Sequence, residues 1–333
     1  MGYLIGTDEA GYGPNLGPLV VSATLWHVPD IGSIGELSKI DLYKRFSRRV
    51  TSNAPKPLKS GRPSSKVWIA DSKMLYKPGG GVRHLERGVL GSLQAIDNQH
   101  SPSKWSQLWP ALAPECTSDV SGSPWYESFD EQLPVAAEVD TIQQATKTLT
   151  AAFDSSNIRL TAIRSAVVFP KTFNGLLEVH GNKSEVLSKT TLGLVTQLIN
   201  GLPEREPVFV NCDKHGGRNK YSPLIQAEFP ETLVEVHGES RPISIYRFGQ
   251  DSGRVEMRFQ AKGEGFLPAA LASMTSKYLR ELAMRAFNDF WCRRVDDLKP
   301  TAGYPVDARR FHTQIKPAQK RLAISDTALW RRK

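Results

Sequence analysis

The sequence predicts an α/β fold in which a mixed sheet is flanked by helices. Short apolar, β-branched segments alternate along the chain with segments whose apolar residues recur every three or four positions, the patterns of strands and amphipathic helices. With 333 residues, of which 40% are hydrophobic, the chain can bury a large core. We therefore expect one elaborated domain or two smaller ones, with insertions between the regular elements.

The first half of the chain begins with two strands. Residues 3–7 are mostly apolar, and the β-branched residues 19–26 are expected to return antiparallel to them after a Gly-Pro turn. Residues 44–66 are basic and then rich in Pro, Ser and Gly, which predicts a flexible loop. The other expected elements are strands at 67–70 and 158–169, helices at 85–96 and 136–153, and an irregular surface insertion at 100–133 packed down by Trp105, Trp109 and Trp125.

The second half shows the same alternation. A helix is expected at 184–199 and a short buried strand at 207–212, which ends on Asp213. Three β-rich segments follow at 232–237, 243–248 and 255–261, and the turn at 249–253 predicts that the last two form a hairpin. A long helix is then expected at 267–291, and residues 319–325 are interpreted as a basic tail.

Composition limits the class of protein. The formal net charge of +9 and the pI near 9.4 favour an anionic partner. The three cysteines lie far apart, which favours a reducing compartment and argues against a zinc finger. Because no signal peptide pattern and no apolar run of bilayer length are visible, we expect a cytoplasmic protein that does not enter membranes.

An acidic pair stands where the first strand runs into a glycine-rich turn. Asp8 and Glu9 precede the turn Gly11-Tyr12-Gly13-Pro14. Adjacent carboxylates at the end of a buried strand are costly unless a cation pairs with them, and the glycines allow positive φ and close backbone approach. A divalent metal with a polyanion held against the glycines would explain the pattern. An acidic surface turn between two strands is the alternative, and this stretch alone leaves it open.

Further acids share this placement at the end of a strand or the start of a helix. They are Asp71, Asp213 and Glu264. Magnesium binds carboxylate oxygens and substrate phosphate oxygens, and two such ions about 4 Å apart can activate water and stabilise the leaving oxygen of a phosphodiester. For each single acid, a helix cap or an exposed turn is the alternative, because spacing does not establish that the acids converge.

Five blocks, in order, resemble the motifs of type 2 ribonucleases H (ribonuclease HII). The first is Ile5-Gly6-Thr7-Asp8-Glu9-Ala10-Gly11-Tyr12-Gly13-Pro14 with Gly17-Pro18-Leu19-Val20-Val21. The others lie at 70–75, at 208–213, at 262–269 with 272–281, and at 303–312. The resemblance covers the core of the chain, so residues 36–66 and 98–155 are expected to be insertions.

The resemblance implies a fold, an activity and partners. The fold would be a single ribonuclease H-like domain over residues 1–333, with a C-terminal helical part at 267–333 that binds substrate. The activity would be endonucleolytic cleavage of RNA in RNA–DNA hybrids, or at ribonucleotides embedded in duplex DNA, with Mg²⁺ or Mn²⁺ as cofactor. It implies no obligate protein partner.

The same resemblance implies roles for individual residues. The catalytic metal ligands would be Asp8, Glu9, Asp213 and Glu264. Substrate contacts would come from the Ser72-Lys73 pair and from Lys277, with both lysines on the phosphate side. The backbone around Gly11, Tyr12 and Gly13 would approach the ribose 2′-OH, which distinguishes RNA from DNA, and Tyr304 would stack on a sugar.

Three positions depart from the family pattern. Tyr12 stands where the family has Arg or Lys, Met74 replaces the second Lys of its segment, and Glu264 replaces an Asp. These departures keep two alternatives open: a nucleic-acid-binding protein of the same fold that cleaves weakly or not at all, and a metal nuclease of the same fold that acts on another DNA substrate.

Overall fold

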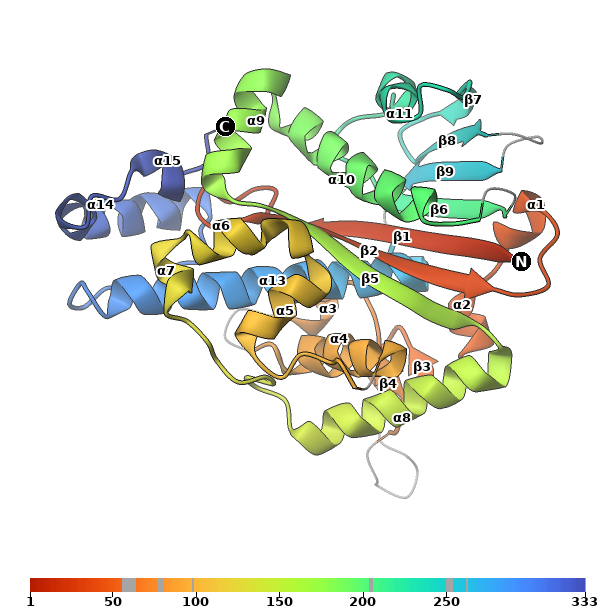
Figure 1. Ribbon diagram of the computed structural model, residues 1–333, viewed down its shortest axis with the longest axis horizontal. Coiled ribbons are helices and arrows are strands. Elements are labelled where there is room, and N and C mark those ends of the chain that lie inside the picture. Colours follow the sequence, from red (N-terminus) through yellow and green to blue (C-terminus); the bar gives the residue numbers. More distant parts are fainter. Residues whose placement is uncertain are drawn as a thin grey trace.

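The computed structural model describes residues 1–55, 64–76, 81–97, 99–203, 206–249, 254–261 and 263–332, without the side chain of Glu264. Among these residues, seven strands form one sheet in the order β5-β2-β1-β6-β9-β8-β7, and β3 and β4 pair separately (Figure 1). The strands are β1 (Gly2–Ala10), β2 (Leu19–Val28), β3 (Val50–Thr51), β4 (Val67–Trp68), β5 (Arg159–Val168), β6 (Val208–Asp213), β7 (Glu235–Glu239), β8 (Ile243–Phe248) and β9 (Val255–Gln260).

Helices lie on both faces of the sheet, so the predicted fold class is confirmed. They are α1 (Ile34–Leu37), α2 (Leu42–Arg45), α3 (Ser72–Leu75), α4 (Arg83–Ile96), α5 (Trp105–Leu112), α6 (Thr117–Ser121), α7 (Pro124–Glu127), α8 (Val139–Ser156), α9 (Pro170–His180), α10 (Lys183–Asn200), α11 (Ser222–Glu228), α13 (Leu267–Cys292), α14 (Pro305–Arg321) and α15 (Asp326–Leu329), with short 3₁₀ turns η1 (Pro114–Cys116) and η2 (Gly263–Gly265). None of the helices in the described part of the chain has the length and apolarity that crossing a membrane requires.

The three central strands of the sheet run parallel, and strand direction alternates on either side of them. β1 pairs antiparallel with β2, as predicted, and β2 pairs antiparallel with β5. On its other side β1 runs parallel to β6, which runs parallel to β9. The predicted hairpin of β8 and β9 is confirmed as an antiparallel pair, although its turn at 250–253 lies outside the described residues. The carboxyl ends of β1, β6 and β9 therefore meet at one edge of the sheet.

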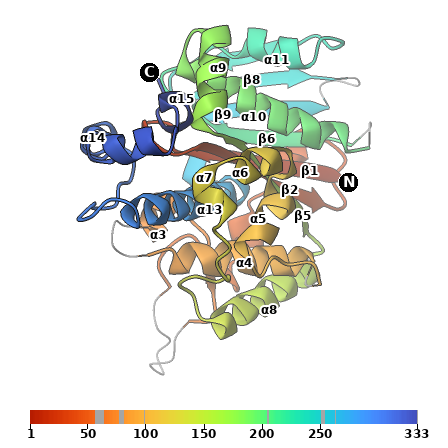
Figure 2. The same cartoon turned by 60° about the vertical axis from the view of Figure 1, so that its left-hand side comes forward.

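The two faces of the sheet bury different sets of side chains. Alternate residues of a strand point to opposite faces, so Leu4 and Val20 join the cluster under α13 while Ile5 and Val21 join the cluster under α10. Figure 2 shows α13 on one side of the sheet with α4 and α8 beyond it, and α9, α10 and α11 on the other. Gly6 allows the start of α13 to lie against β1, because a Cβ there would come within 2.1 Å of the Ala269 nitrogen.

Residues 100–133 are more ordered than the sequence predicts. Residues 100–133 were expected to be irregular, but they form α5, η1, α6 and α7, and Trp105, Trp109 and Trp125 are buried there as expected. The rings of Trp105 and Trp109 pack edge-on against each other, and Trp125 packs edge-on against Phe287 of α13. This aromatic packing supplies stability that helix periodicity does not reveal. The buried Glu86 carboxylate on α4 accepts hydrogen bonds from three backbone N–H groups, those of residues 135 to 137. These bonds hold the segment before α8 against α4.

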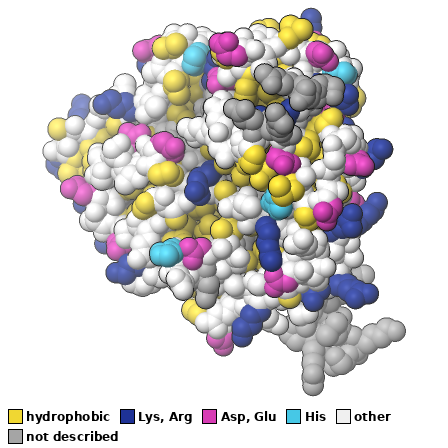
Figure 3. Space-filling model, turned by 45° about the vertical axis from the view of Figure 1, so that its right-hand side comes forward, with side chains coloured by type: hydrophobic (Ala, Val, Ile, Leu, Met, Phe, Trp, Pro, Cys, Tyr) yellow, Lys and Arg dark blue, Asp and Glu magenta, His cyan; other side chains and the backbone are white. Residues whose placement is uncertain are grey.

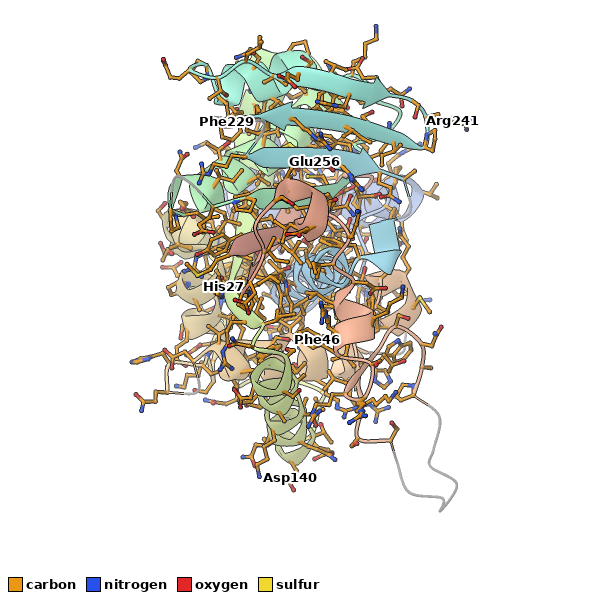
Figure 4. The ribbon with its side chains drawn as sticks, turned by 90° about the vertical axis from the view of Figure 1, so that its right-hand side faces the viewer. His27, Phe46, Asp140, Phe229, Arg241 and Glu256 are labelled. Atoms are coloured by element: carbon orange, nitrogen blue, oxygen red, sulfur yellow. The ribbon has the colours of Figure 1, made fainter. Side chains whose placement is uncertain are left out.

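The basic segment at 44–66 is also not simply a loop. It begins with the end of α2 and includes β3, which pairs parallel with β4, while residues 56–63 lie outside the described part of the chain. Phe46 packs between Trp26 and Phe153, and Figure 4 shows it between the sheet and α8. Figure 4 also shows Glu256 among the outer strands, where its buried carboxylate pairs with Arg247 and Arg258.

The segment interpreted as a basic tail is folded. Residues 319–321 end α14, and the chain continues through α15. The Gln319 amide is buried and donates hydrogen bonds to the Ile324 carbonyl and to Asp326. Lys320 and Arg321 are themselves exposed, whereas Leu329 and Arg331 further along are buried.

Candidate active site

Three carboxylates converge at the sheet edge where the parallel strands end. Asp8 and Glu9 come from the end of β1 and Asp213 is the last residue of β6, with Thr7 opposite Cys212 in the register. One carboxylate oxygen from each of these three lies within 4.8 Å of the others. This parallel register places Asp8 beside Asp213, although most of the chain separates them in sequence.

Burial and mutual repulsion dominate the electrostatics of this cluster. Burial, with a further contribution from Asp213, raises the pKa of the Asp8 carboxyl to about 7. Burial and the adjacent Asp8 raise the pKa of Glu9 to about 8. The Glu9 N–H donates to Asp8 Oδ1 at 2.9 Å, and the Ser273 hydroxyl also favours the charged form of Asp8. A cluster of carboxylate oxygens that repel one another fits a divalent cation that prefers oxygen ligands.

A pocket of about 280 Å³ opens over the cluster. Its lining residues come from the ends of β1, β6 and β9 and from the starts of α3 and α13. They are Thr7, Asp8, Asp71, Lys73, Asp213, Lys214, Gly216, Ala261, Gly263, Ala269, Ala270 and Ser273. Ligands of open α/β sheets bind in the crevice outside the carboxyl ends of strands, and this pocket has that position.

The Asp71-Ser72-Lys73 segment forms one wall of the pocket. Asp71 caps α3 by accepting the Lys73 N–H at 2.7 Å. Ser72 is buried, and its N–H donates to Ser273 Oγ at 3.2 Å, so that α3 is held against α13. The Lys73 ammonium lies 3.7 Å from Asp71 Oδ2 and is largely exposed at the mouth of the pocket. Lys73 thus has the exposure that a phosphate contact needs, while Ser72 has a local packing role.

Lys277 is held by neighbouring side chains. Its ammonium donates to Glu281 Oε1 at 2.5 Å and lies 4.2 Å from the centre of the Tyr76 ring. The Tyr76 hydroxyl donates to the other oxygen of Glu281. The structure therefore places Lys277 on the helix that borders the pocket, but it does not bring its ammonium into the pocket lining.

The two predicted turn glycines have different roles. Gly11 has φ +88°, and a Cβ there would lie 2.5 Å from the Pro18 oxygen and 2.6 Å from Arg280 Nε, so that only glycine fits. Gly13 does not have positive φ, which differs from the expectation for the turn, and the turn's second positive φ falls at Gly17. A Cβ on Gly13 would lie 3.8 Å from the ring of Tyr304.

Tyr304 lies beside this turn because two backbone hydrogen bonds join the segments. The N–H groups of Asn15 and Leu16 both donate to the Gly303 carbonyl. The Tyr304 side chain is 55% exposed, which leaves a large aromatic surface available beside Gly13.

Tyr12 has a cation next to it that comes from a distant segment. The ammonium of Lys183, at the start of α10, lies 4.7 Å from the centre of the Tyr12 ring. Burial and the charge of Glu9 raise the pKa of the Tyr12 hydroxyl. The positive charge that position 12 lacks is therefore supplied nearby by Lys183.

Several residues at the site were not predicted. Lys214 follows Asp213 directly, and Ser273 and Arg280 lie on the long helix that the sequence indicates, so their positions could have been inferred from neighbours. No signal in the sequence pointed to Lys183 or Arg331. The side chain of Glu264 lies outside the described residues, although its backbone belongs to η2 and the adjacent Gly263 lines the pocket. Its role stays a prediction.

Similar folds occur among solved structures. The chain resembles ribonuclease HII from Archaeoglobus fulgidus, seen in a complex with PCNA, and ribonuclease H2 from Pyrococcus horikoshii OT3. Each comparison gives a TM-score of 0.42 and 14% identity and covers 98% of this chain and 92% of the other. The comparison with Bst-RNase HIII in complex with Mn²⁺ gives a TM-score of 0.39 and 12% identity. It covers 99% of this chain and 66% of the other.

No protein-family model matches the chain. No curated protein matches it in sequence. The distant structural likenesses carry no argument about activity. The predicted fold class is confirmed by the sheet order and the flanking helices, and the function is argued below from the site itself.

Proposed function

We propose that this protein is a metal-dependent endonuclease of the ribonuclease H type. Its substrate would be RNA in RNA–DNA hybrids or ribonucleotides embedded in duplex DNA, and its cofactor Mg²⁺ or Mn²⁺. The observation that carries the proposal is the convergence of Asp8, Glu9 and Asp213 at the carboxyl ends of two parallel strands, where Asp8 and Asp213 line an open pocket.

The chemistry follows from these residues. Bound divalent cations would supply charge neutralisation and an activated water for phosphodiester hydrolysis. Asp8, Glu9 and Asp213 would hold the cations, with Glu264 as the proposed fourth carboxylate. Ser273 and the Glu9 N–H hold the Asp8 carboxylate in place.

Substrate recognition would use the rim of the pocket. The backbone at Gly11, Tyr12 and Gly13 would approach the ribose, and Tyr304, in the helical part at 267–333, would stack on a sugar. Lys73 would contact a phosphate from the pocket mouth, and Lys183 would add positive charge beside Tyr12. Lys277 would reach a phosphate only after exchanging its ion pair with Glu281, so we expect a smaller contribution from it.

The test is cleavage of three labelled duplexes with Mg²⁺ or Mn²⁺: a uniform RNA–DNA hybrid, a DNA duplex with one ribonucleotide, and an all-DNA duplex. We expect cuts in the first or second and none in the third. Asp213→Asn should abolish cleavage while duplex binding persists, and Asp119→Asn, at an exposed position on α6, serves as the matched control.

The other outcomes identify the alternatives. Retained metal-dependent turnover by the Asp213→Asn protein would contradict the metal-ligand assignment. Binding without cleavage by the wild-type protein would favour the weakly cleaving or non-cleaving binder, and equal cutting of all-DNA duplex would favour a nuclease with another DNA substrate.

A further inference from the structure

The segment Trp330–Arg332 is joined to the glycine turn at the other end of the sequence. Trp330 pairs with Leu16 as an antiparallel bridge. The Arg331 N–H donates to the Asn15 carbonyl at 2.8 Å, and the Asn15 side-chain amide donates to the Arg331 carbonyl at 2.9 Å. These contacts place Arg331 directly behind the turn that holds Gly11 and Tyr12.

The Arg331 side chain is buried under this turn. It is 1% exposed, and its Nη2 donates to the Gly11 carbonyl at 2.5 Å and to the Pro14 carbonyl. Its guanidinium lies 4.9 Å from the centre of the Phe173 ring on α9. One side-chain nitrogen thus binds both ends of the Gly11–Pro14 turn.

This arrangement is poorly explained by stability alone. Within the described part of the chain, Arg331 Nε and Nη1 are buried without a hydrogen-bond partner. The buried guanidinium also lies near the like charge of Arg280, and both factors lower its pKa. A buried charge with incomplete hydrogen bonding is costly, and an apolar side chain in the same space would avoid that cost.

The contacts do fix the direction of backbone groups. Because a peptide unit is planar and trans, holding the Gly11 carbonyl toward Arg331 turns the N–H of Tyr12 the opposite way. Because Arg331 also holds the Pro14 carbonyl, the direction of the Asn15 N–H is fixed in the same way. That N–H donates to the carbonyl of Gly303, the residue before Tyr304. The guanidinium therefore sets the backbone of the turn and its position relative to Tyr304.

We propose that Arg331 is a positioning residue that holds the Gly11–Pro14 turn in the conformation that reads the ribonucleotide. This inference rests on the proposed function, since it assigns the turn to substrate recognition. Arg331 acts from behind the turn through the Gly11 and Pro14 carbonyls, at a position separate from the carboxylate cluster.

The test compares Arg331→Ala and Arg331→Lys with Arg332→Ala. The neighbouring Arg332 is exposed and pairs with Glu178, so its loss controls for the charge and for the segment. Losing hydrogen bonds from a charged group corresponds to about a 10- to 100-fold effect. We expect KM for the duplex with one ribonucleotide to rise by about that factor in both Arg331 variants, with a smaller change in kcat.

Two readouts separate positioning from general stability. Amide hydrogen exchange at Asn15 and Leu16, whose N–H groups donate to the Gly303 carbonyl, should become faster without substrate in the Arg331 variants, while the strand β1 amides stay protected. The dissociation constant for Mn²⁺ should stay within about twofold of the wild-type value, a change much smaller than the rise expected in KM. Added guanidinium should partly reverse the rise in KM of the Ala variant, and Lys should not substitute fully because it lacks the planar fork.

Three results would overturn the inference. The first is that both Arg331 variants keep the wild-type KM and the wild-type exchange rates. The others are an equal rise in KM in Arg332→Ala, or faster exchange over the whole sheet in the Arg331 variants. If the wild-type protein cleaves no ribonucleotide-containing duplex, the proposed function fails. The exchange at Asn15 and Leu16 still reports whether Arg331 orders the turn, so the two failures are distinguishable.

Discussion

Asp8, Glu9 and Asp213 bring three carboxylates close together in a partly buried site. The raised pKa values of Asp8 and Glu9 reflect burial first and neighbouring carboxylates second. A group that is harder to ionise in the folded state than in the unfolded state makes folding less favourable at high pH. The site therefore reduces the stability of the metal-free protein, which is the usual relation between a functional cluster and its scaffold.

Removing one of these charges should stabilise the metal-free protein. Asp8→Asn keeps an oxygen that can accept the Glu9 N–H but relieves the repulsion. We expect the free energy of unfolding at pH 8 to increase by about 1–2 kcal/mol, a value reduced for the partial solvent exposure of the cluster. Urea unfolding without metal measures this, and a loss of stability would contradict the electrostatic account.

The same shifts predict a pH dependence. The folded-state pKa values of about 7 for Asp8 and about 8 for Glu9 lie above the unfolded values, so the folded protein retains protons that the unfolded chain has lost. The stability of the metal-free protein should therefore fall as pH rises from about 5 to 8. Mn²⁺ affinity should rise over the upper part of this range, because binding displaces protons. Thermal unfolding and Mn²⁺ titration between these pH values check both slopes, and a flat Mn²⁺ profile would count against the carboxylate site.

At the scale of elements, regular strands and long helices could be predicted because their patterns are local. The strand of Val208–Asp213 and the helix from Leu267 have dense apolar residues at the spacing of their type. Helices α5 to α7 could not be predicted in the same way, since aromatic packing by Trp105 and Trp125 stabilises them. The convergence of Asp8 with Asp213 depends on a pairing register between distant strands, which spacing along the chain does not determine.

The glycine turn offers a matched pair of substitutions. Gly11→Ala places a Cβ against the Pro18 oxygen and Arg280 at positive φ, whereas Gly13→Ala meets only the Tyr304 ring at ordinary contact distance. We expect Gly11→Ala to lower the free energy of unfolding by about 2 kcal/mol or more and Gly13→Ala by less than about 1 kcal/mol. Urea denaturation of both variants tests this, and equal effects would show that the turn is not constrained at Gly11.

At the scale of the whole molecule, the net charge of +9 is the difference between 43 Lys and Arg residues and 34 Asp and Glu residues. On the face in Figure 3, Lys and Arg side chains are interspersed with Asp and Glu side chains. Many cations are also paired, as in Arg285 with Glu131 and Arg218 with Glu185. The net charge of +9 favours association with a polyanion in general, while under the proposed function the binding position would depend on a few cations, such as Lys73 at the pocket mouth and Lys183 beside Tyr12.

Affinity for duplex nucleic acid should fall as the salt concentration rises. The slope of log affinity against log salt concentration reports the number of phosphate contacts. Each contact contributes about 0.9 to the slope of log affinity against log salt. Lys183→Ala should reduce that slope by about one contact, and the exposed Lys147→Ala on α8, away from the pocket, should leave it unchanged. Fluorescence anisotropy over a salt series measures this, and an affinity independent of salt would point away from a nucleic-acid ligand.

The parallel pairing of β1 with β6 has a consequence for the order of folding. β1 can pair with β2 as soon as both have been synthesised, since a short turn joins them, but its other edge must wait for a strand made much later. Contacts between such distant segments close slowly, because the loop entropy is lost before the contact energy is gained. During that interval Asp8 and Glu9 belong to an antiparallel hairpin without Asp213. We therefore expect the nascent chain to acquire metal affinity late, after most of its β1–β2–β5 sheet has formed.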